Sequence, residues 1–273
     1  MLGAIIGDIA GSRFEWHSLK SKEFTLLTRE QGCRPTDDSV MTLAVAQAIL
    51  DCAGDWTELG KKAVTSMQRL GRLYPEAGYG GRFAVWLQRD DPQPYHSYGN
   101  GAAMRVSPCG FAASSLEEAV LLADRVTEVT HNHPEGMKAA RAVASAIYLA
   151  RTGHSPAEIR AFIETQYYAI DFTLDSIRPG YGFDVSCQGS VPQAFQSLFE
   201  STGFEDAVRN AVSLGGDSDT IGAITGGMAQ AVYGVPADLR DQALAFLDRT
   251  QTDILLGFED RFGAYPAKEE TRP

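Results

Sequence analysis

The sequence predicts an all-α globular protein, and three observations support this fold class. Apolar residues recur at spacings of three and four along much of the chain, which is the period of an amphipathic helix. Alternating apolar and polar residues are scarce, so we expect at most short strands. Hydrophobic residues make up 44% of the 273-residue chain, enough for a large buried core.

Nine segments carry the helical period. Serines that favour a helix start precede three of them: Ser114 and Ser115, Ser155, and Ser190, which lies two residues before Pro192. The predicted helical segments are residues 38–53, 56–74, 114–130, 134–153, 155–166, 190–202, 204–214, 221–234 and 236–254.

The chain has no obvious domain boundary. No linker, low-complexity tract or internal repeat divides it, so we expect a single domain over residues 1–273. The opening stretch MLGAIIGDIAGS is apolar but lacks the basic region of a signal peptide. No segment approaches the roughly 18 unbroken apolar residues of a membrane span, so we expect no membrane partner.

Cysteine spacing and net charge restrict the cellular compartment and the class of partner. Cys33, Cys52, Cys109 and Cys187 lie far apart, which argues against a zinc site and against a disulfide framework. We therefore expect a reducing cytoplasm. The chain has 24 basic and 35 acidic residues, a net charge of −11, and no basic run, which argues against nucleic acid as the main partner.

Two predicted helices begin in the same unusual way, in the stretches PTDDSVMTLAVAQA and GGDSDTIGAITGGMAQA. One acidic or hydroxyl side chain at each start is explained by capping, because it accepts hydrogen bonds from free N–H groups of the first turn. A cap needs only one side-chain oxygen. Asp37 with Asp38, and Asp217 with Asp219, therefore provide more carboxylate than capping requires, and adjacent carboxylates repel each other.

A divalent cation would relieve that repulsion. Mg²⁺ and Mn²⁺ prefer oxygen ligands such as carboxylates, hydroxyls and water. Glycines in and after the second cluster would let the backbone approach closely around such a site, although helix packing alone also explains them. These glycines are Gly215, Gly216, Gly222, Gly226 and Gly227.

Five motifs give the sequence a family resemblance: GAIIGDIAGSRFE, PTDDS, GNGAAMRVSP, VTHNHPEG and GGDSDTIGAITGGMA. In this order they resemble the motifs of the ADP-ribosylglycohydrolases, and they extend from residue 3 to about residue 229. The resemblance implies an all-α fold with two Mg²⁺ or Mn²⁺ ions in a central cleft. It also implies hydrolysis of the glycosidic bond between ADP-ribose and a protein side chain or small conjugate.

The resemblance assigns both ions to six residues, with water or ribose hydroxyls completing each coordination shell. The expected metal ligands are Thr36, Asp37, Asp38, Asp217, Asp219 and Thr220. It makes Glu15 the candidate acid or base, assisted by Asp38 or Asp219, although Glu15 also suits a solvated helix position. We interpret Asp8, in the same motif, as a structural cap at a helix entrance.

The remaining motifs concern the ligand. Glycine-flanked backbone N–H groups near a helix start can surround a diphosphate, although such a turn alone is weak support. The resemblance places Asn100, Gly101 and Met104 beside ADP-ribose and lets His131 contact its ribose or phosphate. We interpret His133 as structural.

The stretch RPGYGFDVSCQGSVPQAF departs from the family pattern. Where many members have an aromatic residue that stacks on the ligand, this chain has Ser186 and Cys187, and its aromatics Tyr181 and Phe183 lie farther upstream. Either aromatic could reach the ligand. Cys187 lacks a neighbouring base in sequence, so we interpret it as a buried small residue and not as a nucleophile.

The chemistry implied by the resemblance leaves alternatives open. Divalent ions would fix the ribose hydroxyls and lower the pKa of bound water, while Glu15 activates that water or protonates the leaving group. A route through an opened ribose ring is the alternative. The functional alternatives are a non-catalytic ADP-ribose binder, a crystallin-like structural protein, or an enzyme acting on another glycosidic substrate. We expect a monomer.

Overall fold

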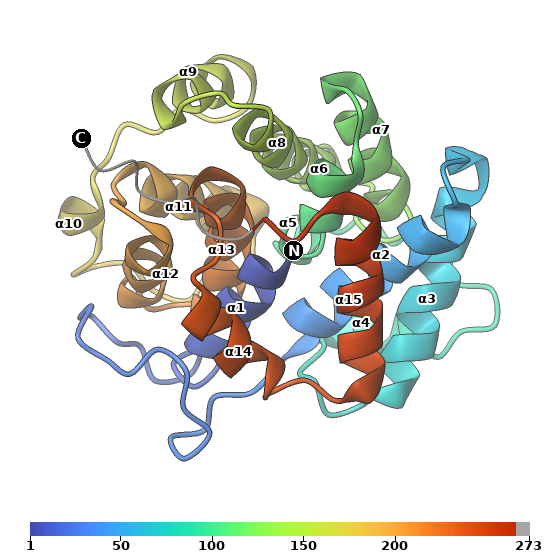
Figure 1. Ribbon diagram of the computed structural model, residues 1–273, viewed down its shortest axis with the longest axis horizontal. Helices are drawn as coiled ribbons and strands as arrows, with labels where there is room; N and C mark the ends of the chain where they lie inside the picture. The colour runs from blue at the N-terminus through green and yellow to red at the C-terminus, as the bar shows by residue number, and fades with distance from the viewer. Residues whose placement is uncertain (266–273) are drawn as a thin grey trace.

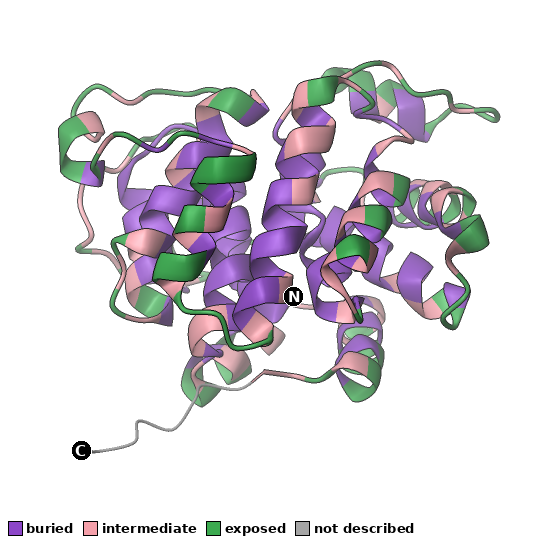
Figure 2. Cartoon of the chain, turned by 90° about the horizontal axis from the view of Figure 1, so that it is seen from above, coloured by how far each residue is buried: buried purple, intermediate pink, exposed green. Residues whose placement is uncertain are grey.

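Helices α1 (Leu2–Gly11) and α13 (Ser218–Tyr233) form the centre of the computed structural model, which describes residues 1–265 (Figure 1). Every residue of α1 is buried, and α13 is buried from Ser218 through Ala231. Figure 2 shows that exposed residues lie on the outer turns and loops. The two helices are therefore the core, and the other helices cover them.

The backbones of α1 and α13 touch, because glycines face each other along both helices. A Cβ atom on Gly7 would lie 1.9 Å from the carbonyl oxygen of Gly222, and one on Gly3 would lie 2.2 Å from that of Gly226. Gly11 packs in the same way against Ser218. The residue numbers rise along one helix as they fall along the other, so the helices are antiparallel.

The outer helices pack around this pair. Helices α2, α8, α11 and α12 all contact α13, and α2 also contacts α15 on its outer side. Their bounds are α2 (Asp37–Cys52), η1 (Trp56–Glu58), α3 (Leu59–Leu73), α4 (Gly81–Leu87), α5 (Gly101–Met104), α6 (Ser107–Ala112), α7 (Leu116–Thr127), α8 (Pro134–Arg151), α9 (Pro156–Gln166), α10 (Leu174–Ile177), α11 (Cys187–Phe199), α12 (Phe204–Ser213), α14 (Ala237–Leu244) and α15 (Arg249–Phe262).

The all-α fold class is confirmed. Within residues 1–265 no strand is present, and an isolated antiparallel bridge pairs Gly99 with Ser186. Ser115 and Ser155 are N-caps of α7 and α9, as predicted. None of the helices in this part of the chain has the length and hydropathy needed to cross a membrane.

Two predicted helix boundaries are wrong. The segment 236–254 is not one helix, because Asp248 and Gln251 form a capping box that starts α15 after α14 has ended. Helix α11 starts at Cys187 with Ser186 as its N-cap, so Ser190 lies inside the helix and Pro192 in its second turn.

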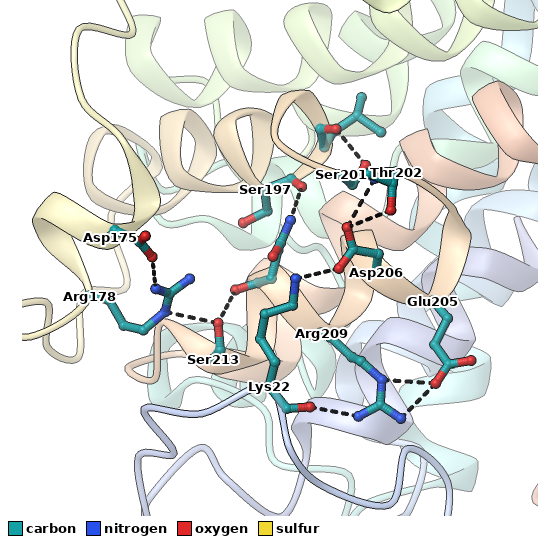
Figure 3. Close-up of polar contacts among 12 residues, drawn as sticks. Lys22, Asp175, Arg178, Ser197, Ser201, Thr202, Glu205, Asp206, Arg209 and Ser213 are labelled. Carbon is teal, nitrogen blue, oxygen red and sulfur yellow. Dashed lines mark hydrogen bonds and ion pairs between the residues drawn. The ribbon is translucent and has the colours of Figure 1, made fainter.

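The loop between α1 and α2 is held against α12 (Figure 3). Lys22 forms an ion pair with Asp206, and Arg209 donates to the backbone oxygens of Lys22 and Phe24 at 2.8 and 2.7 Å. Arg209 is itself paired with Glu205 at 2.6 Å. The bonds to backbone oxygens fix the path of a loop that has no regular secondary structure of its own.

The contact between α1 and α13 predicts that Gly7→Ala destabilises the protein. A methyl group 1.9 Å from a backbone oxygen forces the two helices apart, at a cost of about 3 kcal/mol. The free energy of unfolding from urea titration measures this cost. Gly180→Ala is the matched control, because nothing lies within 4 Å of a Cβ there and its change should stay within about 0.5 kcal/mol. Equal stability of the two variants would contradict the contact.

Candidate metal centre

The first turns of α2 and α13 meet beside the end of α1, and this brings the two predicted acid clusters together. The hydroxyl of Thr220 donates to Asp38 Oδ2 over 3.2 Å, which joins the clusters directly. Asp8, Asp38 and Asp219 each place a carboxylate oxygen within 4.8 Å of the others. Glu15, Asp217 and Asp219 form a second such group, so Asp219 belongs to both.

Asp8 joins the centre, and its predicted role as a cap at the entrance of its own helix is wrong. It lies in the interior of α1 and accepts hydrogen bonds from the start of α2 instead. The backbone N–H groups of Thr36 and Ser39 donate to it at 2.9 and 3.1 Å, and the Thr36 hydroxyl donates at 2.6 Å. The Ser39 hydroxyl donates as well. Asp8 thus remains structural, but it caps α2 from a different helix.

Burial and mutual repulsion raise the pKa of the central carboxyl groups. Burial is the main cause for Asp38 and Asp219, whose pKa values lie well above the ordinary aspartate value. Repulsion adds to this: Asp219 and Asp8 act on Asp38, while Asp217 and Asp8 act on Asp219. The protein has therefore concentrated negative charge where water cannot screen it.

The pKa values of two outer carboxyl groups of the centre, Asp37 and Glu15, are also raised. Burial, followed by the charges of Asp8 and Asp217, raises the pKa of Asp37 to about 7. Burial, followed by the charge of Asp217, raises the pKa of Glu15, which the nearby Arg34 partly opposes. Glu15 is half-buried in a bend after α1 and not in a helix, so the solvated-helix interpretation is wrong.

These residues fit a hard divalent cation. Asp38 Oδ1 is buried and has no hydrogen-bond partner within residues 1–265, so it has a lone pair free for an ion. The side-chain oxygens that could bind an ion here belong to carboxylates and hydroxyls, the ligands that Mg²⁺ and Mn²⁺ prefer. Asp37 lies outside both carboxylate groups, and the Thr36 hydroxyl donates its proton to Asp8. The six-ligand set therefore stays a prediction.

The turn around Asn100 lies directly beside the carboxylates. The Asn100 amide donates to Asp217 Oδ2 at 2.7 Å and to the Ser190 hydroxyl at 3.1 Å. Asn100 thus holds a predicted metal ligand in place, a role that the sequence did not indicate. Gly101 and Met104 follow in α5, where Met104 is buried. Their contacts with a ligand stay predictions.

His131 lies on the other side of the same turn. A Cβ atom on Gly101 or Gly99 would be 3.4 or 3.6 Å from His131 Nε2. The opposite ring nitrogen, Nδ1, is 2.7 Å from the Thr130 hydroxyl and 3.3 Å from a guanidinium nitrogen of Arg105. No sequence pattern singled out Arg105, because an arginine inside an apolar motif carries no recognisable spacing.

The two predicted stacking aromatics have different surroundings. Tyr181 is half-buried, and its hydroxyl donates to the backbone oxygen of Gly189 at 2.6 Å. Phe183 is exposed and stacks on Trp16, with ring centroids 5.0 Å apart. Trp16 follows Glu15 in sequence, so this exposed aromatic pair lies near the candidate acid or base. The sequence had not drawn attention to Trp16.

The structural interpretations of His133 and Cys187 agree with their surroundings in the fold. His133 is the N-cap of α8, and its Nδ1 accepts a hydrogen bond from the backbone N–H of Glu135. Burial raises the pKa of the Cys187 thiol to about 12, so it stays protonated at neutral pH. Its thiol lies 3.1 Å from the Gly99 carbonyl oxygen, to which it donates.

The fold and the buried carboxylates define a class: helical proteins with an oxygen-lined candidate metal centre between helix starts. The model of the ADP-ribosylglycohydrolase family matches residues 1–268, and the chain belongs to this family.

Named relatives agree with this assignment. The chain is 26% identical to the ADP-ribosylhydrolase ARH3 of Mus musculus, over 93% of this chain and 88% of the relative. It is 27% identical to the ADP-ribosylarginine hydrolase Tri1 of Pseudomonas putida, over 86% of this chain and 70% of the relative. A solved structure described as an ADP-ribosylglycohydrolase-related protein complex shares the fold, with a TM-score of 0.66, 22% identity, and coverage of 96% of this chain and 97% of that chain.

The raised pKa values predict that the metal-free protein loses stability as the pH rises. The pKa of Asp37 rises from 3.8 in the unfolded chain to about 7 in the fold, so the folded state binds more protons across that interval. The free energy of unfolding therefore falls with increasing pH over this range. Urea titrations in EDTA at about pH 5 and about pH 7.5 measure the slope.

Asp219→Asn should reduce this loss, because it removes a charge that belongs to both carboxylate groups. Asp171→Asn is the control, since Asp171 is exposed and belongs to neither group. Adding Mg²⁺ or Mn²⁺ at the higher pH should restore stability to the wild type more than to Asp219→Asn. The same pH slope in all three proteins would show that the carboxylates do not repel each other as described.

Proposed function

We propose that this protein is a metal-dependent hydrolase that cleaves the glycosidic bond between ADP-ribose and an acceptor and releases ADP-ribose. Family membership supports the substrate class. The observation that carries the proposal is the pair of carboxylate groups that share Asp219, with the half-buried Glu15 in one of them. A protein that only binds a nucleotide has no need to bury so many acids together.

Two Mg²⁺ or Mn²⁺ ions are part of the proposal. Asp38, Asp217 and Asp219 would hold them, together with Thr36, Asp37 and Thr220 at the helix starts. When bound, such ions hold ribose hydroxyls and lower the pKa of a bound water. Asn100 keeps Asp217 oriented through its 2.7 Å hydrogen bond, and Asp8 keeps the first turn of α2 in place.

Glu15 is the residue we place at the proton transfer. Its pKa is raised by burial and by Asp217, so its carboxyl group can exchange a proton closer to neutral pH than an exposed glutamate can. It either takes a proton from the attacking water or gives one to the leaving group. Asp38 and Asp219 assist by keeping the negative field that favours a positively charged, oxocarbenium-like transition state.

The ligand would extend from the carboxylates across the Asn100 turn. Gly101 and Met104 follow that turn in α5, His131 lies beside it, and all three would border the ADP-ribose. Tyr181 or Phe183 would stack on its base, and Trp16 enlarges the exposed aromatic surface available there.

The acceptor and the compartment also belong to the proposal. One relative is named for ADP-ribosylarginine, whereas the ARH3 relatives are named only as ADP-ribosylhydrolases. Identifying the acceptor therefore requires a comparison of substrates with different linkages to ADP-ribose. We propose a cytoplasmic location, which the four free, buried cysteines support.

The first test is a panel of arginine-, serine- and acetyl-linked ADP-ribose with Mg²⁺ or Mn²⁺ present. We expect release of ADP-ribose from at least one linkage, complete loss of release in EDTA, and recovery when the ion returns, because the clustered carboxylates need a cation. Chromatography of free ADP-ribose measures the reaction. Binding of ADP-ribose without release from any linkage would favour the non-catalytic alternative.

The second test is Glu15→Gln. Glutamine keeps the shape of the side chain but cannot exchange a proton, so kcat should fall by roughly 10² to 10⁴ while ADP-ribose still binds. Glu23→Gln is the control, since Glu23 is exposed in the same loop. Unchanged turnover in Glu15→Gln would remove Glu15 from the mechanism. Loss of both binding and turnover would indicate that Glu15 positions the ligand instead.

A further inference from the structure

Arg105 is a buried arginine without a carboxylate partner. It directly follows α5, and only 1% of the residue is exposed. No ion pair within residues 1–265 includes it. Burial of an arginine costs free energy unless its donors are used, so the groups that accept from it need an explanation.

The guanidinium of Arg105 donates to two neighbouring residues. One nitrogen donates to the Thr130 hydroxyl and lies 3.3 Å from His131 Nδ1. A guanidinium can only donate, so the Thr130 oxygen accepts from Arg105 and keeps its own hydrogen for another acceptor. The atom within reach of that hydrogen is His131 Nδ1, 2.7 Å away.

These contacts determine the tautomer of His131. Both polar neighbours of Nδ1 present hydrogens to it, so Nδ1 accepts and the ring proton resides on Nε2. Doubly protonated histidine would place an N–H group against two donors. The pKa of His131 also favours the neutral ring. Burial and the charges of Arg105 and Arg82 lower it well below its ordinary value.

The Nε2–H group points toward the Asn100 turn. It faces the glycines on either side of Asn100, at 3.4 and 3.6 Å from their would-be Cβ atoms, and it makes no hydrogen bond within residues 1–265. Since Asn100 holds Asp217, this free donor lies one turn away from the carboxylates. A ligand oxygen at the turn would be a suitable acceptor.

We propose that Arg105 is a positioning residue that acts through Thr130 to hold His131 as the neutral tautomer with its proton on Nε2, ready to donate to an oxygen of ADP-ribose. The ligand in this statement rests on the proposed function. The tautomer does not, because it follows from contacts within the protein.

The test combines a measurement on the protein alone with a binding measurement. Long-range ¹H–¹⁵N spectra report which nitrogen of each of the five histidines carries a proton, and His131→Asn identifies the signal of His131. Wild type should show a protonated Nε2 and an unprotonated Nδ1. Arg105→Met and Thr130→Val should convert this state into a mixture of tautomers or into the protonated ring.

The same variants should bind ADP-ribose about tenfold more weakly in Mg²⁺, as expected when one hydrogen bond worth 1.4 kcal/mol is lost. Arg105→Lys keeps a charged donor and should recover most of the affinity and the wild-type tautomer. Arg151→Met is the control, because Arg151 donates to the Gly110 backbone at 2.8 Å on another part of the molecule. If Arg105→Met does not fold, Thr130→Val still tests whether this hydrogen-bond chain holds the tautomer of His131.

Two results would overturn the proposal. One is a wild-type His131 that carries its proton on Nδ1. The other is a folded Arg105→Met or Thr130→Val protein with an unchanged tautomer and unchanged affinity. If wild type binds no ADP-ribose, the ligand and the proposed function fail together, while the spectra of the free protein still establish or refute the positioning of His131 by Arg105.

Discussion

The backbone contact between α1 and α13 brings the carboxylates of the candidate metal centre together. Glycines at 3, 7 and 11 let α1 lie against α13 at a distance that any side chain would prevent. At the end of this contact, Gly11 meets Ser218, so the carboxylates of Asp8 and Asp219 come within 4.8 Å of each other. A wider spacing would still bury apolar surface, but it would separate the carboxylates that make the centre a candidate for metal binding.

The same packing creates a free-energy cost. The carboxylates are buried side by side, and burial and repulsion both raise their pKa values, so their ionised state opposes folding. Part of that cost is offset locally: Asp8 accepts four hydrogen bonds from Thr36 and Ser39, and Asn100 donates to Asp217. Asp38 Oδ1 has no such partner within residues 1–265. A destabilised cluster supported by a stable core is typical of a binding site.

The sequence predicted those parts of the fold and site that have a local signature. Amphipathic helices and acid clusters at helix starts can be recognised within one segment, and Thr220 bonded to Asp38 joins the two clusters as expected. Helix α1 was not among the predicted helices, because it is buried all round and has no polar face to give a period. The partners of Asp8 lie 28 and 31 residues away, and Arg105 meets His131 across 26, so no local pattern indicates them.

The polar groups around the Asn100 turn divide into two sets of opposite character. On one side are carboxylates with raised pKa values, which attract cations. On the other side is a neutral His131 backed by the buried cation Arg105, which presents hydrogen-bond donors. Asn100 separates them and contributes an uncharged donor to Asp217. Under the proposed function this polarity orients the ligand: the ribose to be cleaved, whose hydroxyls bind ions well, lies over the carboxylates, and the anionic diphosphate lies toward the donors. The ribose to be cleaved and the neighbouring diphosphate would thus each meet groups of complementary character.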